Sequence, residues 1–352
     1  MTKYCLWILS TILVLSGCVR DRSIEEIKLI ESLGYDVEGN QISGSAAFHL
    51  YQDVPPEAPV SLFTATSDTP HGIFLEFTSQ STIPVEIGQT RSLVVSEDMA
   101  KQGISELIGT LIRDPVISNN ARIVISRQNA QNVLSLIMKY PPYYFSNLVE
   151  NNMETGNFPI SNVHYVLSQF YGEGQDVYLP IIKIEEPERI TMDGLGILKD
   201  GKLTLQLTNE ETLFFKLLKD QHVTGMYELK NDDQEKIFFR ILNGKNEIKF
   251  KDNTAEFYIE VNLQVKDFPK SYNLSKKKDV QVMTTVIEKH LTEKLDSLLK
   301  KLQENKVDPV GIGEIFRENQ RNWTQEQFDK NYPNLPFNIS VRVKIVQTGV
   351  GN

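Results

Sequence analysis

The stretch that decides the fold of the C-terminal half is FYIEVNLQV, residues 257–265. Its odd-numbered positions are all apolar, whereas Glu260, Asn262 and Gln264 are polar. A second stretch, FNISVRVKI at residues 337–345, repeats the pattern. Alternation with a period of two predicts strands in a sheet with one face in water, and such sheets are normally antiparallel. We therefore expect an antiparallel sheet at this end of the chain.

Helices are expected to cover one face of that sheet. Between the two strands, Val280–Gln303 carries its apolar residues on a single helical stripe, which consists of Met283, Ile287, Leu291, Leu295, Leu298 and Leu302. Shorter helices are expected over Ile312–Glu318 and from Thr324, whose spacing to Gln327 is that of a capping box. An antiparallel sheet with helices on one face is an α+β arrangement.

The N-terminal half has a different pattern, in which strands and helices alternate. Ile42–Tyr51, after a turn at Gly39-Asn40, predicts a hairpin. Helices are expected over Ile73–Ser79, Asp98–Ile112, Asn129–Met138, Tyr143–Glu150 and Val163–Phe170, and strands over Arg91–Val95, Arg122–Ser126 and Val177–Ile182. The apolar stripe of the second helix consists of Ile104, Leu107, Ile108, Leu111 and Ile112. This half is predicted to be a mixed α/β domain.

A domain boundary is expected at Glu185-Glu186-Pro187. After it, Ile190–Lys199 and Lys202–Leu207 predict a hairpin, and Glu210–Leu218 predicts a helix with Asn209 as its N-cap. We therefore expect a multi-domain α+β protein with two to three domains. The ranges are a leader at 1–17, an N-terminal α/β domain at 18–186, a middle hairpin–helix domain at 187–235, and a C-terminal domain of antiparallel sheet plus long helix at 236–352.

The first residues have the features of an export signal. Lys3 precedes the apolar run Leu6–Leu15, which is too short for a transmembrane helix of roughly 20 residues. The run ends at Leu15-Ser16-Gly17-Cys18, and these small residues before a cysteine resemble the lipobox of bacterial lipoproteins. This predicts a leader removed after Gly17 and acyl chains on Cys18, which bind the chain to the lipid bilayer. The alternative is an ordinary cysteine after a buried helix.

Composition excludes several functions. Cys5 would leave with the leader and Cys18 would be acylated, so no thiol remains for catalysis, redox exchange or zinc binding. The formal net charge of −9 argues against nucleic acid as a partner. The five histidines are scattered without metal-ligand spacing, and His290 is expected to be a partly buried structural residue on the long helix.

Other motifs do not indicate an enzyme. Gly172-Glu-Gly174 and Gly311-Ile-Gly313 lack the third glycine of a nucleotide-binding loop, and backbone packing explains them better. Asp308 is expected to cap the helix that follows it. No Gly-x-Ser-x-Gly elbow is present, and the paired acids at 185–186 and 232–233 lie in polar stretches. We expect no catalytic residue, cofactor or metal.

One aromatic cluster is a candidate partner surface. It lies in YPPYYF at 140–145, and its members are Tyr140, Tyr143, Tyr144 and Phe145. Aromatic residues are enriched at protein interfaces. The alternative is that these rings pack between two helices of the same chain.

Several segments together resemble a known family. They are Gly34-Tyr35-Asp36, GLGILKDGKL at 194–203, KVDPVGIGEIF at 306–316, Trp323, Tyr332-Pro333 and Thr348-Gly349. With the lipobox, they resemble the Ger(x)C family, the lipoprotein C subunits of the nutrient germinant receptors of spore-forming bacteria. The chain departs from the family's usual Cys-Trp-Asp-Arg-Arg after the lipobox, and it matches poorly over residues 54–72.

The resemblance implies a three-domain fold without known catalytic activity. It also implies a place beside polytopic membrane subunits, on the outer face of the spore inner membrane. Our leading expectation is therefore a non-enzymatic accessory subunit of a germinant receptor. The first alternative is a lipoprotein that captures a small nutrient for a transporter, and the second is an extracellular hydrolase.

Overall fold

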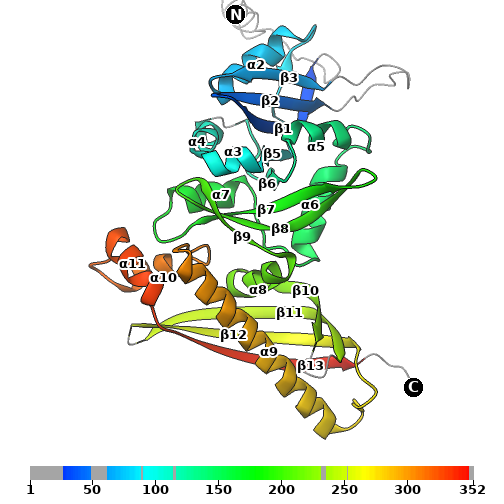
Figure 1. Cartoon of the computed structure of the whole chain (residues 1–352), viewed down its shortest axis with the longest axis vertical. Coiled ribbons are helices and arrows are strands. Elements are labelled where there is room, and N and C mark those ends of the chain that lie inside the picture. Colours follow the sequence, from blue (N-terminus) through cyan, green and yellow to red (C-terminus); the bar gives the residue numbers. More distant parts are fainter. Residues whose placement is uncertain are drawn as a thin grey trace, which may run out of the picture.

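The structure is a computed structural model that describes residues 27–48, 62–88, 90–113, 116–230, 235–251 and 253–348. The predicted leader and Cys18 lie outside this part of the chain. The described residues form two sheets, which follow one another along the long axis of the molecule (Figure 1). The predicted multi-domain α+β class is confirmed.

The N-terminal sheet has nine strands in the order β3-β2-β1-β5-β6-β7-β8-β9, with the short β4 beside β1. The strands are β1 (Lys28–Glu38), β2 (Gln41–Phe48), β3 (Phe63–Ser67), β4 (Val85–Glu86), β5 (Ser92–Ser96), β6 (Arg122–Ser126), β7 (Val177–Glu185), β8 (Arg189–Lys199) and β9 (Lys202–Leu207). The predicted hairpin around Gly39-Asn40 is confirmed as β1 and β2. The central strands β1, β5, β6 and β7 are parallel, because helices connect them.

Helices cover both faces of this sheet. Buried side chains of α2 (Pro70–Ser79), α3 (Glu97–Gln102), α4 (Ser105–Arg113) and α7 (Val163–Tyr171) share one core cluster with the sheet. Those of α5 (Ala130–Ile137) and α6 (Tyr144–Glu154) share another. The prediction of a single helix over Asp98–Ile112 is wrong, because Gly103 has a φ of 129° and breaks it. Ile104, Leu107 and Ile108 are buried as expected, and the side chains of Leu111 and Ile112 are outside the described ones.

The region after the predicted boundary is joined to this sheet. The predicted hairpin around Asp200-Gly201 is confirmed as β8 and β9, but β8 pairs with β7 and extends the N-terminal sheet. The hairpin therefore does not form a separate middle unit with the helix after it. That helix is α8 (Asn209–Lys219), and its N-cap is Thr208 rather than Asn209. Thr208 and Glu211 form a reciprocal capping box there, which fixes the first turn one residue earlier.

The C-terminal sheet has four strands in chain order: β10 (Val223–Lys230), β11 (Lys236–Lys251), β12 (Thr254–Asp267) and β13 (Phe337–Thr348). The first three are antiparallel, but β13 runs parallel to β12. The expected antiparallel pairing is thus confirmed for β10, β11 and β12 and is wrong for β13. The long helix α9 (Lys277–Glu304) lies between β12 and β13 in the chain and provides the crossover that a parallel pair needs.

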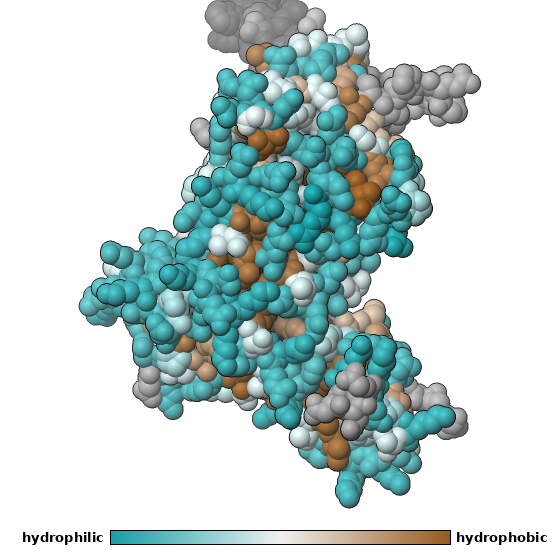
Figure 2. Space-filling view, viewed as in Figure 1, coloured by the Kyte–Doolittle hydropathy of each residue, from teal (hydrophilic) through white to brown (hydrophobic). Residues whose placement is uncertain are grey.

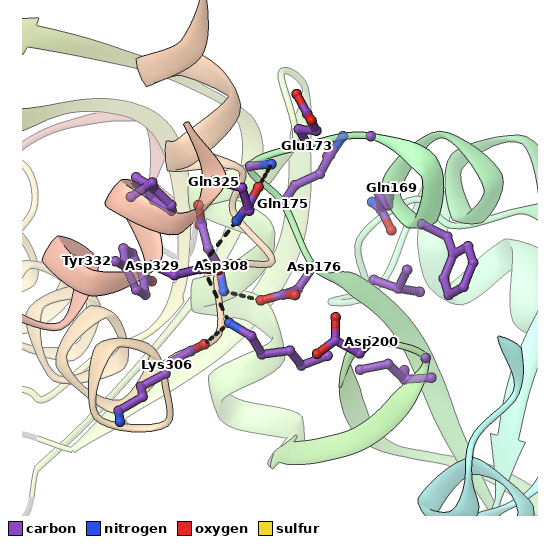
Figure 3. A pocket seen from close by; sticks show the side chains of 18 residues that line it. Gln169, Glu173, Gln175, Asp176, Asp200, Lys306, Asp308, Gln325, Asp329 and Tyr332 are labelled. Carbon is purple, nitrogen blue, oxygen red and sulfur yellow. Dashed lines mark hydrogen bonds and ion pairs between the residues drawn. The ribbon is translucent and has the colours of Figure 1, made fainter. Parts of the chain in front are cut away.

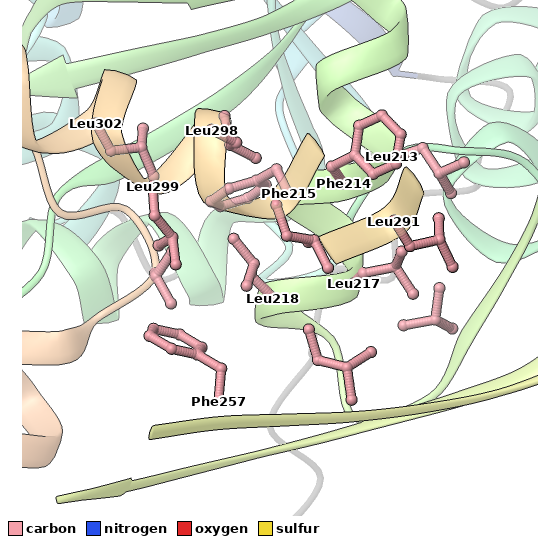
Figure 4. Close-up of a cluster of buried hydrophobic side chains, with 14 of the residues drawn as sticks. Leu213, Phe214, Phe215, Leu217, Leu218, Phe257, Leu291, Leu298, Leu299 and Leu302 are labelled. Carbon is pink, nitrogen blue, oxygen red and sulfur yellow. The ribbon is translucent and has the colours of Figure 1, made fainter. Parts of the chain in front are cut away.

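The core of this half lies between the sheet and helices α8 and α9. All six residues of the predicted α9 stripe are buried, and they face Phe257 and its neighbours on β12. Helix α8 lies beside α9 and contributes Phe214, Phe215 and Leu218 (Figure 4). The helices α10 (Ile312–Asn319) and α11 (Gln325–Asn331) and the 3-10 turn η2 (Tyr332–Asn334) close one end of the sheet.

The surface agrees with the acidic, polar composition. On the face in Figure 2, hydrophilic residues predominate and apolar ones appear as separate patches. The outer residues of the C-terminal strands, such as Glu260 and Arg342, are exposed and paired with each other. No helix within the described ranges combines the length and the apolarity that crossing a membrane requires.

Candidate functional site

A cavity of about 420 Å³ lies where the two halves meet. Its walls come from the loop after α7, the start of β7, the β8–β9 turn, the segment before α10, and α11. Figure 3 shows Asp176 from one half and Asp308 from the other half meeting there. The segment 306–316, which is one of those that resemble the Ger(x)C family, therefore forms one side of this junction.

Asp308 organises the junction. Its side chain is 4% exposed, and its two carboxylate oxygens accept hydrogen bonds from the backbone N–H groups of Gly311 (3.0 Å) and Gly313 (2.8 Å). The predicted capping role is thus confirmed. The backbone N–H of Asp308 donates to the Asp176 carboxylate at 2.6 Å. The side chain of Asp308 therefore stabilises the start of α10, and its backbone N–H contacts the other half of the molecule.

Two glycines allow the backbones to approach closely. The N–H of Glu314 donates to the carbonyl of Gly174 at 2.9 Å, and the N–H of Gly174 donates to the Gln325 side chain at 2.8 Å. A Cβ atom on Gly174 would lie 2.3 Å from the Glu314 nitrogen. The predicted backbone role of the two glycine pairs is confirmed at Gly174, which has a φ of +82°, and at Gly313, which packs against it.

Two lysines on α8 support the junction: the buried Lys216 contacts the N-terminal half, and the partly buried Lys219 contacts the segment before α10. The Lys216 ammonium donates to the carbonyls of Met153 and Gly156, both at 2.8 Å, at the end of α6. The Lys219 ammonium donates to the carbonyl of Val310 at 3.0 Å, just before α10. Burial lowers the pKa of both amines. These contacts tie the last turn of α6 and the start of α10 to one helix.

Because Asp308 and Asp176 are buried at the junction, we expect the stability of the protein to depend on pH. Burial raises the pKa of Asp308 to about 7 and that of Asp176 to about 6, against roughly 3.9 for an unfolded aspartate. The folded state therefore holds protons that the unfolded chain releases. The stabilisation from this source is complete below about pH 4 and is lost as the pH rises to about 7.

The comparison of wild type with Asp308→Asn isolates this effect, because an amide does not titrate. We expect the free energy of unfolding of the wild type to fall more steeply than that of the variant between about pH 5 and about pH 8. Urea unfolding at several pH values measures both slopes. Asp329→Asn, at an exposed position on the same cavity wall, should keep the wild-type slope. Equal slopes for wild type and Asp308→Asn would contradict the account.

A second polar cluster lies at the carboxyl ends of the parallel strands. Arg127, just after β6, contacts Glu97 at 2.9 Å and Asp193 at 2.8 Å, and it also donates to Gln206. Lys183 contacts Asp193 at 3.0 Å. Although burial opposes it, hydrogen bonding to Lys101 and Arg127 lowers the pKa of Glu97 to about 2. Each of these charged groups has an oppositely charged partner in the cluster. The ion pairs and the hydrogen bond to Gln206 therefore hold β6, β8, β9 and α3 together.

The predicted aromatic surface is only partly at the surface. Phe145 is fully buried in the core beneath α6, so its assignment to a contact surface is wrong. Tyr140 and Tyr144 are half-buried and stacked with ring centroids 4.1 Å apart. The N–H of Tyr143 donates to the Glu31 carboxylate at 2.8 Å, and Arg91 covers its ring. The three tyrosines remain the candidate partner surface.

Of the histidines and cysteines named above, His290 has a structural contact, and others lie outside the residues that the structure describes. The Tyr227 hydroxyl and His290 Nε2 are 3.0 Å apart, and burial lowers the pKa of that histidine, which agrees with a structural role. Within the part of the chain that the structure describes, no three potential metal ligands come together. Cys18 and His49 are outside that part.

Comparisons with known proteins place the chain. One family model, described as "Spore germination protein N-terminal domain", matches residues 20–184. A second, "Spore germination B3/ GerAC like, C-terminal", matches residues 193–349. The gap between the two models coincides with the predicted boundary at 185–187, although the N-terminal sheet continues across it.

Individual relatives match this chain over nearly the full length of both proteins. Spore germination protein GerQC of Bacillus cereus is 27% identical over 98% of this chain and 99% of its own. Spore germination protein KC of Bacillus subtilis is 21% identical over 100% of this chain and 98% of its own. The crystal structure of the GerBC protein has the same fold, with a TM-score of 0.60 and 18% identity over 90% of this chain and 97% of that one. Because the two models between them match residues from 20 to 349, the chain belongs to the family of GerAC-like spore germination proteins.

Proposed function

We propose that this protein is a lipid-anchored, non-enzymatic C subunit of a spore nutrient germinant receptor. The observation that carries the proposal is the family match, which extends over both halves of the chain. Full-length relatives in two Bacillus species are named as spore germination proteins. The leader and the lipobox at Cys18 support the anchor.

The anchor sets the distance between the folded body and the membrane. Each buried methylene contributes roughly 0.8 kcal/mol, and two or more acyl chains on Cys18 bind stably where one chain binds marginally. The stretch of chain from Cys18 to Ile27 can span at most about 30 Å. The N-terminal sheet is then nearest the bilayer, and the C-terminal sheet lies toward the other end of the long axis (Figure 1).

The proposed mechanism is contact with polytopic membrane subunits of the receptor. The lipid confines the body to a thin layer next to the membrane and raises its effective concentration near those subunits. The contacts of Asp308 with Asp176 and of Lys216 with α6 hold the two halves together, so a contact on one half can orient the other. Tyr140, Tyr143 and Tyr144 are the candidate contact residues.

Affinity purification from spores tests the proposal. A tagged chain, extracted from spore membranes with mild detergent, should co-purify with a polytopic membrane protein. The matched control is a Cys18→Ala chain, which should recover less of that partner because it lacks the anchor. Failure of any polytopic protein to co-purify, together with normal nutrient germination in a deletion strain, would overturn the receptor role.

A solute-binding lipoprotein is the second candidate, and the cavity between the two halves favours it. A volume of about 420 Å³ is within the range of small-molecule pockets, roughly 300–1,000 Å³. A nutrient bound there would raise the melting temperature of the chain. An unchanged melting temperature across a panel of amino acids, sugars and nucleosides would reject this candidate.

A further inference from the structure

A second cavity lies at the end of the C-terminal sheet, next to the junction cavity, with which it shares Phe328 and Tyr332 as wall residues. Its volume is about 310 Å³, and it is enclosed by α10, α11, η2 and the turn between β11 and β12. Phe328, which is buried, lies against Phe316, Trp323 and Tyr332, with ring centroids 5.3–6.3 Å away. The floor of this cavity is therefore aromatic.

The rim of the cavity consists of amides. Five amide side chains line it, and no hydrogen bond within the described part of the chain engages any of them: Asn253, Gln320, Gln327, Asn331 and Asn334. All five residues are exposed, so a molecule in the cavity can reach their side chains. An amide offers both a donor and an acceptor, so the rim can bind groups that also donate and accept.

The lining is also uncharged. All twelve lining residues are neutral at pH 7, whereas 24% of the whole chain is charged. A charged ligand would lose its hydration here without gaining an opposite charge. This property separates the cavity from the acidic junction and favours a neutral ligand.

Trp323 carries a buried hydrogen-bond donor, its indole N–H, that has no acceptor among the described residues. A buried donor without a partner destabilises a protein, because it has lost its hydrogen bond to water and has gained no other. Trp323 also lines the cavity, so a ligand with hydroxyl groups would bring hydrogen-bond acceptors next to this ring.

We propose that this cavity, with its aromatic floor, free amides and Trp323 N–H, is a binding site for an uncharged polyhydroxylated ligand of the saccharide class. Hydroxyl groups both donate and accept, as the amide rim requires. The C–H face of a sugar ring packs against an aromatic ring, which supplies the apolar contact. The volume is at the lower end of the small-molecule range and suits one or two sugar units rather than a polymer.

Trp323 gives a direct readout, because the chain has two tryptophans and the other is Trp7. Trp7 lies in the predicted leader, and the substitution Trp7→Phe leaves Trp323 as the sole tryptophan in any unprocessed chain as well. The protein would be purified in a polyoxyethylene detergent, since a glycoside detergent could occupy the site. Glucose, N-acetylglucosamine and maltose would be titrated in the millimolar range, with lysine and glutamate as charged comparators. We expect a saturable change in Trp323 emission with at least one saccharide and none with the charged solutes.

Amide variants connect that signal to the rim. Gln327→Ala and Asn331→Ala should each weaken the saccharide about tenfold, as the loss of one or two hydrogen bonds would. Asn147→Ala, an exposed amide on α6 in the other half, should have no effect and is the matched control. No saturable response to any saccharide, a response to the charged solutes instead, or equal binding by the rim variants would overturn the proposal.

Discussion

Asp308→Ala is expected to destabilise the protein by about 2–4 kcal/mol. The substitution removes the acceptor for the N–H groups of Gly311 and Gly313 in a buried position. Each buried donor left unsatisfied costs about 1–3 kcal/mol, and relief from burying a carboxyl offsets part of the sum. We therefore expect this side chain to hold the segment before α10 in the position in which its backbone meets Asp176 of the other half.

Urea unfolding of the full chain measures this effect. Asp308→Asn keeps one side-chain oxygen as an acceptor and should lose about half as much stability as Asp308→Ala. Asp329→Ala removes an exposed acid from the same cavity wall and should remain within about 0.5 kcal/mol of wild type. A similarly small change for Asp308→Ala would show that its buried hydrogen bonds are dispensable.

Gly174→Ala is expected to loosen the junction by a different mechanism, at a cost of about 2–5 kcal/mol. The backbone at this position has a φ of +82°, where a side chain costs about 1–2 kcal/mol. The added Cβ would also lie 2.3 Å from the nitrogen of Glu314 and 2.4 Å from the carbonyl carbon of Gly313. Relieving such overlap typically costs a further 1–3 kcal/mol, roughly.

Gly39→Ala separates the two contributions. Gly39 has a φ of +62°, but a Cβ there would meet nothing within 4 Å. This variant should show only the backbone cost, so Gly174→Ala should lose clearly more stability and become more sensitive to proteolysis between the halves. If both variants lost the same amount, the close packing of Gly174 on Gly313 would not be important.

Much of the fold could be predicted because its signals are local. The stripe of α9 and the alternation in β12 and β13 are visible within single segments, and the structure confirms them. Strand pairing is not local, so the sequence does not show that β8 and β9 are hydrogen-bonded to the N-terminal sheet. The parallel pairing of β13 is not visible in its alternation, although the long helix before it is a signal for a crossover.

The junction was predictable only in part. The capping role of Asp308 is predictable because this residue precedes Pro309 and two glycines, a pattern typical of a turn before a helix. Its partner Asp176 is 132 residues away and lies in no motif, so sequence spacing could not pair them. Lys216 is not among the candidate residues named from the sequence, yet a single lysine within LFFKLL at 213–218 is a signal for a buried amine with fixed acceptors.

Mass spectrometry of the N-terminus from spore membranes tests the central claim, the lipid-anchored subunit, most directly. The account predicts that the first residue is Cys18 and that its peptide carries the mass of a diacylglycerol group, with residues 1–17 absent. A chain that keeps its leader, or that begins at Cys18 without lipid, would contradict it.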